Sequence, residues 1–297
     1  MFKGINAIEF NNRFKDNDSC YEYLFSKKWG NGYQCIRCGC KESIKGRTGY
    51  YKRCKNCRYD ESVTANTVFH DMKMPILKAF HLIFRIGSKK KGMSTMELGS
   101  EVGVQQKTAW LFKRKVQEVL EDKAKLKGNV HADEMIVGGH SRGIEHRGRS
   151  LKEKSAVIVA AEILDDGRTG NINFETIKNF EADTLKYALK DMVDQRAYIV
   201  TDQHKSYESL KGEMNIETRK SQKGKALEEI HKQIMLFKNW LRGIHHKCSK
   251  ILLPKYLDEY KFRFNNRNRR HRIFDILIER LMHYAPQPYA VLKSTCE

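Results

Sequence analysis

The chain of 297 residues has no long apolar run. No stretch approaches the ~20 consecutive apolar residues that a membrane-spanning helix requires, so we expect no membrane span. The N-terminal segment MFKGINAIEFNNRFK carries charges where a signal peptide would have its apolar stretch. We therefore expect a cytoplasmic protein, whose cysteines are thiols or metal ligands rather than disulfides.

Acidic residues are also scarce. Asp and Glu total 36 against 56 Lys and Arg, which gives a net charge of +20 at pH 7. Solubility does not require such an excess, and it points to a polyanionic partner, most often nucleic acid. A basic protein without such a partner is the alternative. The hydrophobic fraction of 40% is typical of a globular chain and argues against disorder.

Half of the eight cysteines are paired along the sequence. Cys35 and Cys38 form one C-x-x-C pair, Cys54 and Cys57 form another, and 15 residues separate the two pairs. This spacing is typical of a zinc ribbon. Because four thiolates leave no position for water, we expect a structural zinc ion. Whether the ribbon contacts DNA or only braces the next module stays open. The remaining cysteines lack this pairing and are expected to be ordinary thiols: Cys20, Cys40, Cys248 and Cys296.

A helical pattern begins after Pro75. Ser94 and Glu97 form an S-x-x-E capping box before a short helix that breaks near Gly103, and a longer helix follows over about 105–120. This is the outline of a helix-turn-helix, although an ordinary helical hairpin produces the same pattern. The candidate base-reading residues open the second helix: Gln105, Gln106, Lys107 and Thr108.

The rest of the chain has the pattern of an α/β domain. Strands are expected at VHADEMIVGG, SAVIVAAEIL, GNINFETIKN and AYIVTDQHKSY, with helices over 181–193 and from 225 onward. The polar segment 121–129 is predicted to be a linker. We thus predict three modules: residues 1–65 with the zinc ribbon (ligands within 35–57), a helical DNA-binding module over 66–125, and a catalytic domain over 126–297.

Two acids in this domain stand within or at the end of apolar strands. A carboxylate there is costly to bury unless it is paired or holds a cation. Asp133 and Asp202 from neighbouring strands would suit Mg²⁺ or Mn²⁺, as in two-metal phosphodiester chemistry. A turn or capping role is the alternative. A third ligand should come from the late helix, whose spacing leaves three candidates open: Glu228, Glu229 and His231.

These motifs together resemble insertion-sequence transposases that join a zinc ribbon to a ribonuclease-H-like DDE domain, the bacterial relatives of the Merlin transposons. The resemblance covers nearly the whole chain. Its most specific piece is YLDEYKFRFNNR (256–267), and HADEMIVGG and VTDQHKSY match two further family motifs. The resemblance implies an α/β, ribonuclease-H-like catalytic domain preceded by the zinc ribbon and the helix-turn-helix-like module.

The resemblance also implies a catalytic triad. Asp133 and Asp202 match the first two metal ligands, His231 occupies the third place, and Lys238 follows seven residues later. Many relatives have Glu in the third place, whereas a neutral imidazole brings no negative charge to a cation. The implied activity is metal-dependent (Mg or Mn) DNA strand cleavage and strand transfer. The implied partners are terminal inverted repeats and target DNA, with a homo-oligomer that brings two transposon ends together in the cytoplasm, associated with the nucleoid.

Two basic segments, the loop 142–154 and the tail 267–272, are expected to hold DNA phosphates, with a solvated basic surface as the alternative. The candidate residues are Arg142, Arg147, Arg149, Arg269 and Arg270. Two other functions are alternatives to an active transposase. One is a catalytically inactive or domesticated DNA-binding regulator, and the other is a nuclease or resolvase on the same fold.

Overall fold

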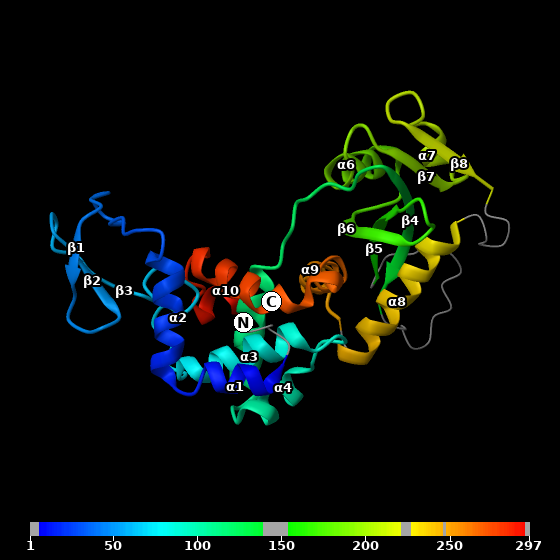
Figure 1. Cartoon of the computed structure of the whole chain (residues 1–297). Coiled ribbons are helices and arrows are strands. Elements are labelled where there is room, and N and C mark those ends of the chain that lie inside the picture. The colour runs from blue at the N-terminus through cyan, green and yellow to red at the C-terminus, as the bar shows by residue number, and fades with distance from the viewer. Residues whose placement is uncertain (1–5, 139–153, 221–226, 246–247, 295–297) are drawn as a thin grey trace. The chain divides into compact units, whose positions relative to one another are not determined.

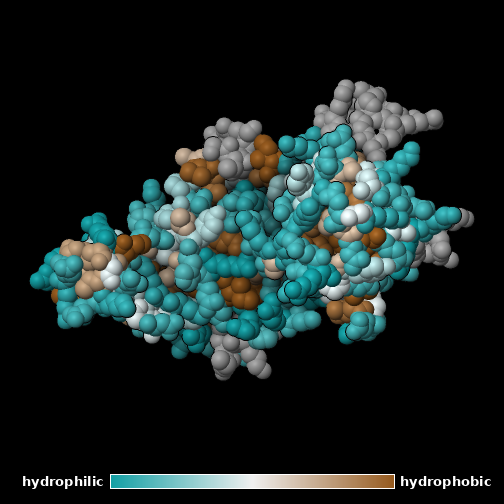
Figure 2. Space-filling view, turned by 90° about the horizontal axis from the view of Figure 1, so that it is seen from above, coloured by the Kyte–Doolittle hydropathy of each residue, from teal (hydrophilic) through white to brown (hydrophobic). Residues whose placement is uncertain are grey.

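We describe a computed structural model of the chain (Figure 1), which covers residues 6–138, 154–220, 227–245 and 248–294. The chain forms two compact units, one of residues 1–119 with 269–297 and one of residues 120–268. No helix in the described ranges is long and apolar enough to cross a membrane. The face shown in Figure 2 is mostly hydrophilic, with apolar side chains in separate small groups.

The first unit is mainly helical. Its helices are α1 (Ala7–Arg13), α2 (Asn17–Trp29), α3 (Ile76–Ser88), α4 (Thr95–Val102), α5 (Gln106–Glu118), α10 (Ile273–His283) and α11 (Tyr289–Ser294). A cluster of aromatic rings fills its core: the Phe10 ring lies 4.4 Å from Phe84 and 5.6 Å from Phe274, and Phe14 lies 5.0 Å from Phe80. Because Phe274 belongs to α10, the C-terminal segment 269–297 is part of this unit, whereas the sequence analysis placed it with the catalytic domain.

A small antiparallel sheet in the same unit carries the cysteine pairs. Its strands are β1 (Ser43–Lys45), β2 (Tyr51–Cys54) and β3 (Asp60–Ser62), in that order. An ion pair joins α2 to β3, since Lys28 Nζ lies 2.8 Å from the buried Glu61 carboxylate. The same ammonium group donates to the carbonyls of Ser62 and Ala65, each at 2.9 Å.

Helices α3, α4 and α5 pack against one another, as a helix-turn-helix requires. The Ser94 side chain caps α4 by accepting a hydrogen bond from the Glu97 N–H at 3.2 Å. Gly103 ends α4 with φ +65°, a left-handed conformation that glycine adopts without strain. The two helices predicted around this turn are therefore confirmed to within about two residues at each end.

The second unit contains a five-stranded mixed sheet. Its strands are β4 (Asn129–Val137), β5 (Ser155–Ile163), β6 (Thr169–Ile177), β7 (Tyr198–Asp202) and β8 (Ile216–Arg219), and their order is β6-β5-β4-β7-β8. The pairs β4–β5 and β5–β6 are antiparallel, whereas β4–β7 and β7–β8 are parallel. Its helices are α6 (Ala182–Met192), α7 (Lys205–Glu208), α8 (Glu228–Ile244) and α9 (Leu253–Asn265), and a 3₁₀ segment, η2 (Arg267–Arg272), follows α9.

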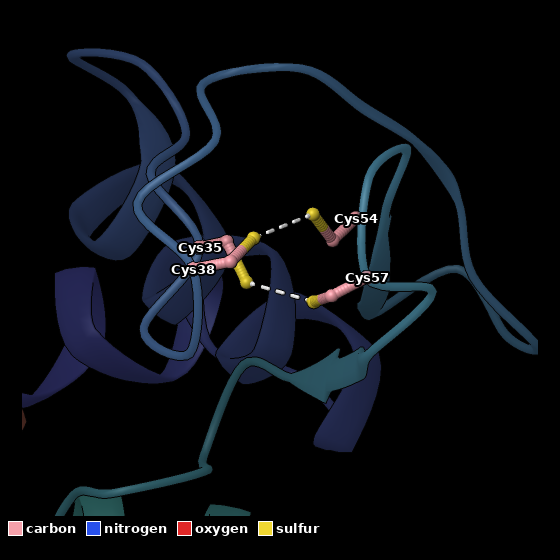
Figure 3. Close-up of side chains that lie close together, drawn as sticks. All are labelled: Cys35, Cys38, Cys54 and Cys57. Carbon is pink, nitrogen blue, oxygen red and sulfur yellow. Dashed lines mark hydrogen bonds between the residues drawn. The ribbon is translucent and has the colours of Figure 1, made fainter.

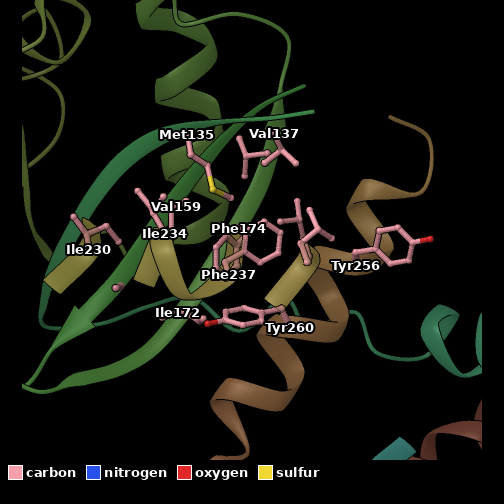
Figure 4. Packing of buried hydrophobic residues seen from close by; sticks show 14 of the residues in the cluster. Met135, Val137, Val159, Ile172, Phe174, Ile230, Ile234, Phe237, Tyr256 and Tyr260 are labelled. Carbon is pink, nitrogen blue, oxygen red and sulfur yellow. The ribbon is translucent and has the colours of Figure 1, made fainter. Parts of the chain in front are cut away.

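Both faces of this sheet are covered. Figure 4 shows the core on one face, where Met135 of β4 and Phe174 of β6 pack with Phe237 of α8 and Tyr260 of α9. The other face packs against α6 and α7. Side chains of a strand alternate between faces, so successive residues of β4 enter different cores. Ala132 accordingly belongs to the α6 side, and Asp133 turns toward α8.

Candidate metal centres and nucleic-acid interface

The four paired cysteines converge as the spacing predicted. Figure 3 shows the two pairs facing each other from two turns, with Cys35 Sγ 3.6 Å from Cys57 Sγ and Cys38 Sγ 3.5 Å from Cys54 Sγ. All four sulfur atoms lie within 4.8 Å of one another. Within the described part of the chain, they form the only group of three or more His, Cys, Asp or Glu side chains that meets this spacing. The set suits a tetrahedral Zn²⁺ ion with four thiolate ligands.

Electrostatics around Cys35 favour the thiolate that zinc requires. Burial acts to raise the pKa of this thiol. Hydrogen bonds from the backbone of Cys38 and Arg37, and from the Cys57 thiol, outweigh burial and bring the pKa down to about 6. The pKa of the neighbouring Cys57 thiol is raised by its hydrogen bonds to the other cysteines, so the sulfur atoms share their protons in the absence of a cation. The three strands of the ribbon have only three or four residues each, so the ion would supply the link that so small a sheet lacks.

The predicted catalytic acids stand side by side in the sheet. The parallel ladder of β4 and β7 ends at the pair of His131 and Val200, and Asp133 and Asp202 each follow two residues later on the same face of the sheet. Burial raises the pKa of Asp133, and the nearby Asp202 charge raises it further. Asp202 Oδ1 is buried and has no hydrogen-bond partner in the described structure. Two close carboxylates with a buried, unpartnered oxygen suit a divalent cation.

His231 is the residue of α8 that reaches this pair. Its Nε2 lies 3.1 Å from Asp133 Oδ2, and its side chain is 38% exposed. The ligand atoms of Asp133, Asp202 and His231 do not all lie within 4.8 Å of one another, although His231 contacts Asp133. Lys238 lies near the same acid: burial and the Arg242 charge lower the pKa of Lys238, while Asp133 acts to raise it.

The other two candidates for the third position point elsewhere. Glu228 is exposed at the start of α8. The Glu229 carboxylate lies 2.7 Å from Lys232 Nζ and accepts a 3.4 Å hydrogen bond from the Thr169 hydroxyl on the edge strand β6. Of the three residues that the sequence left open, the one in contact with Asp133 is therefore His231.

The predicted base-reading residues gather at the start of α5. Gln105, Gln106 and Lys107 are exposed, and Thr108 is half-buried. Two of them already have partners within the unit: Gln106 Nε2 donates to Thr95 Oγ1 at 3.3 Å, and the Lys107 ammonium lies 5.5 Å from the centre of the Tyr289 ring. Their exposure leaves this helix end accessible to a ligand.

The candidate phosphate-binding arginines differ in their surroundings. Arg269 is exposed. Arg270 donates to the Ser88 carbonyl at 2.7 Å and so caps the end of α3, which gives it a structural role. The other candidates lie outside the described residues: Arg142, Arg147 and Arg149.

The YLDEYKFRFNNR motif has a structural role that its pattern alone did not predict. Asn265 pairs with the edge strand β6: its Oδ1 accepts from the Ile172 N–H at 2.9 Å, and its Nδ2 donates to the Ile172 carbonyl at 3.0 Å. The buried Lys261 donates to the Asp122 carbonyl at 2.9 Å, and the fully buried Glu259 lies 2.9 Å from Arg263. The available signal was a helix in which charged residues alternate with buried aromatic ones, as Lys261 and Arg263 do with Tyr260 and Phe262.

Fold and sequence together identify the class of protein. The order and directions of the sheet strands define a ribonuclease-H-like domain, as predicted. Residues 125–265 match the family model of the ISXO2-like transposase domain, and residues 15–60 match that of the transposase zinc-ribbon domain. The two matches span more than half of the chain, which belongs to the insertion-sequence transposases that combine these domains.

Two crystal structures are among the solved structures that are similar to this chain. The crystal structure of the Mos1 strand transfer complex is 12% identical over 63% of this chain and 72% of that chain, with a TM-score of 0.31. The crystal structure of a pre-cleavage Mos1 transpososome is also 12% identical, over 63% and 74% of the two chains, with a TM-score of 0.29. No curated protein matches the chain significantly.

Proposed function

We propose that the protein is a DNA transposase that binds transposon end repeats and catalyses metal-dependent strand cleavage and strand transfer at Asp133, Asp202 and His231. The observation that carries this proposal is the juxtaposition of the two carboxylates on neighbouring strands β4 and β7, with His231 of α8 against one of them, inside a transposase domain. The buried and unpartnered oxygen of Asp202 supports a cation as the missing partner.

Divalent Mg²⁺ or Mn²⁺, when bound, activates water and stabilises the leaving oxygen of a phosphodiester. The chain itself supplies the ligands of the cation and holds them in place. Asp133 and Asp202 supply oxygen ligands and negative charge from a rigid sheet. His231 would be the third ligand, supplied from α8 beside Asp133. Lys238, on the same side of α8, holds a DNA phosphate or the attacking group.

Base reading is assigned to the first unit, whereas the candidate phosphate contacts come from both units. The start of α5 reads bases through Gln105, Gln106, Lys107 and Thr108, and Arg269 with the basic loop 142–154 holds phosphates. The zinc ribbon adds a second basic module, and we propose boundaries at 1–65, 66–125 and 126–297 for the functional modules. Synapsis of two transposon ends requires a homo-oligomer. We expect this oligomer to act on nucleoid DNA in the cytoplasm.

An end-cleavage assay tests the proposal. Purified protein with Mn²⁺ and labelled end DNA should nick the DNA and transfer the freed strand. Asp133→Asn should abolish both steps and leave DNA binding intact, because it removes a charged ligand without changing the shape of the side chain. Asp165→Asn, at an exposed position in the same unit, is the matched control and should keep full activity. Undiminished cleavage by Asp133→Asn would refute the metal assignment.

The second candidate function is a DNA-binding regulator without catalysis. One observation favours it: the third position holds an imidazole, which brings no negative charge and bonds directly to Asp133. For this candidate the wild-type protein binds end DNA but cleaves none of it at any Mn²⁺ or Mg²⁺ concentration.

A further inference from the structure

A cavity of about 540 Å³ opens beside α5 in the first unit. Its walls come from three segments of that unit: residues 70–74, one face of α5, and residues 286–289 at the start of α11. Pockets that bind small ligands and cofactors typically have volumes of about 300–1,000 Å³. The cavity is therefore large enough for a ligand, and none of the metal-centre residues described above lines it.

The wall that α5 supplies is a single side of the helix. Four of its residues follow one another at spacings of three and four, which places them on one face. They are Thr108, Leu111, Phe112 and Lys115. The middle of this face is apolar, since Leu111 is half-buried and Phe112 is 3% exposed. The half-buried Met72 and Met74 add apolar surface from the segment before α3. A ligand in the cavity thus lies between apolar walls.

Lys115 brings a positive charge to these apolar walls. Helical side chains lean toward the N-terminus of their helix, so the Lys115 stem extends over the turn that holds Leu111. The side chain is half-buried, and this burial lowers the pKa of its ammonium group. Within the described residues, no hydrogen bond or ion pair compensates the burial of Lys115. A cation in such a place is costly unless a ligand supplies an anion.

The rim of the cavity is aromatic and basic. Tyr289 is 42% exposed, and the Lys107 ammonium lies 5.5 Å from the centre of its ring. Lys73 adds an exposed cation to the lining. The lining acid Asp71 lies 3.5 Å from His70 and is 89% exposed, so water screens its charge. Apolar walls, an accessible aromatic ring and an uncompensated cation together suit a nucleotide, which has a flat base and a phosphate.

We propose that this cavity takes one unstacked nucleotide of the transposon end, with its base between the apolar walls beside Tyr289 and its phosphate at Lys115. Thr108 belongs both to the cavity wall and to the start of α5, where the proposed base-reading residues stand. DNA bound at that helix end therefore lies beside the cavity. The inference rests on the proposed function, because it requires that α5 binds the transposon end.

Binding of the full-length protein to end DNA, measured by fluorescence anisotropy without divalent metal, tests the cavity. One duplex is fully paired, and each of the others carries a single mismatch at a different position of the end. Extruding a base costs free energy for unpairing and unstacking, and a mismatched base costs least. We therefore expect the wild type to bind about tenfold more tightly when the mismatch falls at the extruded position. Mismatches at other positions should bring no gain.

Three variants of the cavity should lose this gain. Leu111→Trp fills the space, Lys115→Met removes the charge and keeps the stem, and Tyr289→Ala removes the ring. Tyr289→Ala should also weaken binding of the mismatched duplex by about tenfold, because stacking of a base on an aromatic ring contributes about that much. The matched control is Lys15→Met, which removes the same charge from an exposed position of the same unit outside the cavity and should keep the gain. Melting temperatures show which variants are folded, and Lys115→Met and Tyr289→Ala decide the test if Leu111→Trp unfolds.

Three results would overturn the inference. If no mismatch strengthens binding by the wild type, no base leaves the duplex for the cavity. If one does, but the folded cavity variants keep the gain, the base is bound elsewhere. If these variants keep the gain and instead change the oligomeric state in sedimentation, the cavity takes a segment of a second copy of the chain. Failure of the proposed function has a different result, since the wild type would then bind end DNA no more tightly than unrelated DNA.

Discussion

The histidine in the third position yields the most quantitative prediction. His231→Glu restores the acid that many related transposases carry, and it replaces an imidazole 3.1 Å from Asp133 by a carboxylate. Two carboxylates about 4 Å apart repel by about 4 kcal/mol at an effective dielectric constant of about 20. The His231 side chain is 38% exposed, so solvent screening reduces the expected cost to about 1–2 kcal/mol.

This cost should be visible in thermal unfolding. A loss of 1 kcal/mol shifts the melting temperature of a domain of this size by about 2–4 °C, so His231→Glu should melt about 2–8 °C below the wild type without added divalent metal. Saturating Mn²⁺ should shrink or reverse the difference, because a third carboxylate gains more from a nearby cation than an imidazole does. Calorimetry of both proteins, with zinc retained in the ribbon, measures the two differences.

The control and the refuting result follow from the same geometry. Asn239→Glu adds one negative charge at an exposed position of α8, and its effect on the melting temperature should be the same with and without Mn²⁺. If His231→Glu lowers the melting temperature by the same amount with and without Mn²⁺, no cation binds beside residue 231. A melting temperature equal to the wild type without metal would contradict the contact with Asp133 itself.

Three further predictions concern zinc, the edge strand and DNA. Cys35→Ser should lose the bound zinc and unfold the ribbon, as measured by metal content and circular dichroism, whereas Cys40→Ser, outside the four-sulfur cluster, should retain both. Asn265→Ala should lower the free energy of unfolding by about 1–3 kcal/mol, because the N–H and carbonyl of Ile172 lose their partner; Asn268→Ala, at an exposed position, should change it little in the same denaturant titration. End-DNA affinity should fall steeply with added salt in a filter-binding series, and a flat salt dependence would contradict phosphate binding by a chain of charge +20.

Local patterns accounted for much of the fold. The cysteine spacing predicted the ribbon because four thiolates on two short turns have few ways to surround one ion. The helix before Gly103 was predictable from its capping residue, and the apolar strands from their β-branched content. β8 (Ile216–Arg219) was missed, since four residues with a single buried side chain have no periodicity to detect.

The sequence by itself determined which residues are candidates for the site. The tertiary structure decided which of these candidates lie close to one another. Asp133 and Asp202 were recognisable as acids in apolar strands, but their proximity depends on the parallel pairing of β4 with β7, which brings together residues far apart in the chain. Whether His231 or Glu229 faces Asp133 depends on the rotation of α8 about its own axis relative to the sheet. Helical spacing alone does not determine that rotation. The different surroundings of Asp133 and Glu134 have the same origin, because a strand turns adjacent side chains into two different cores.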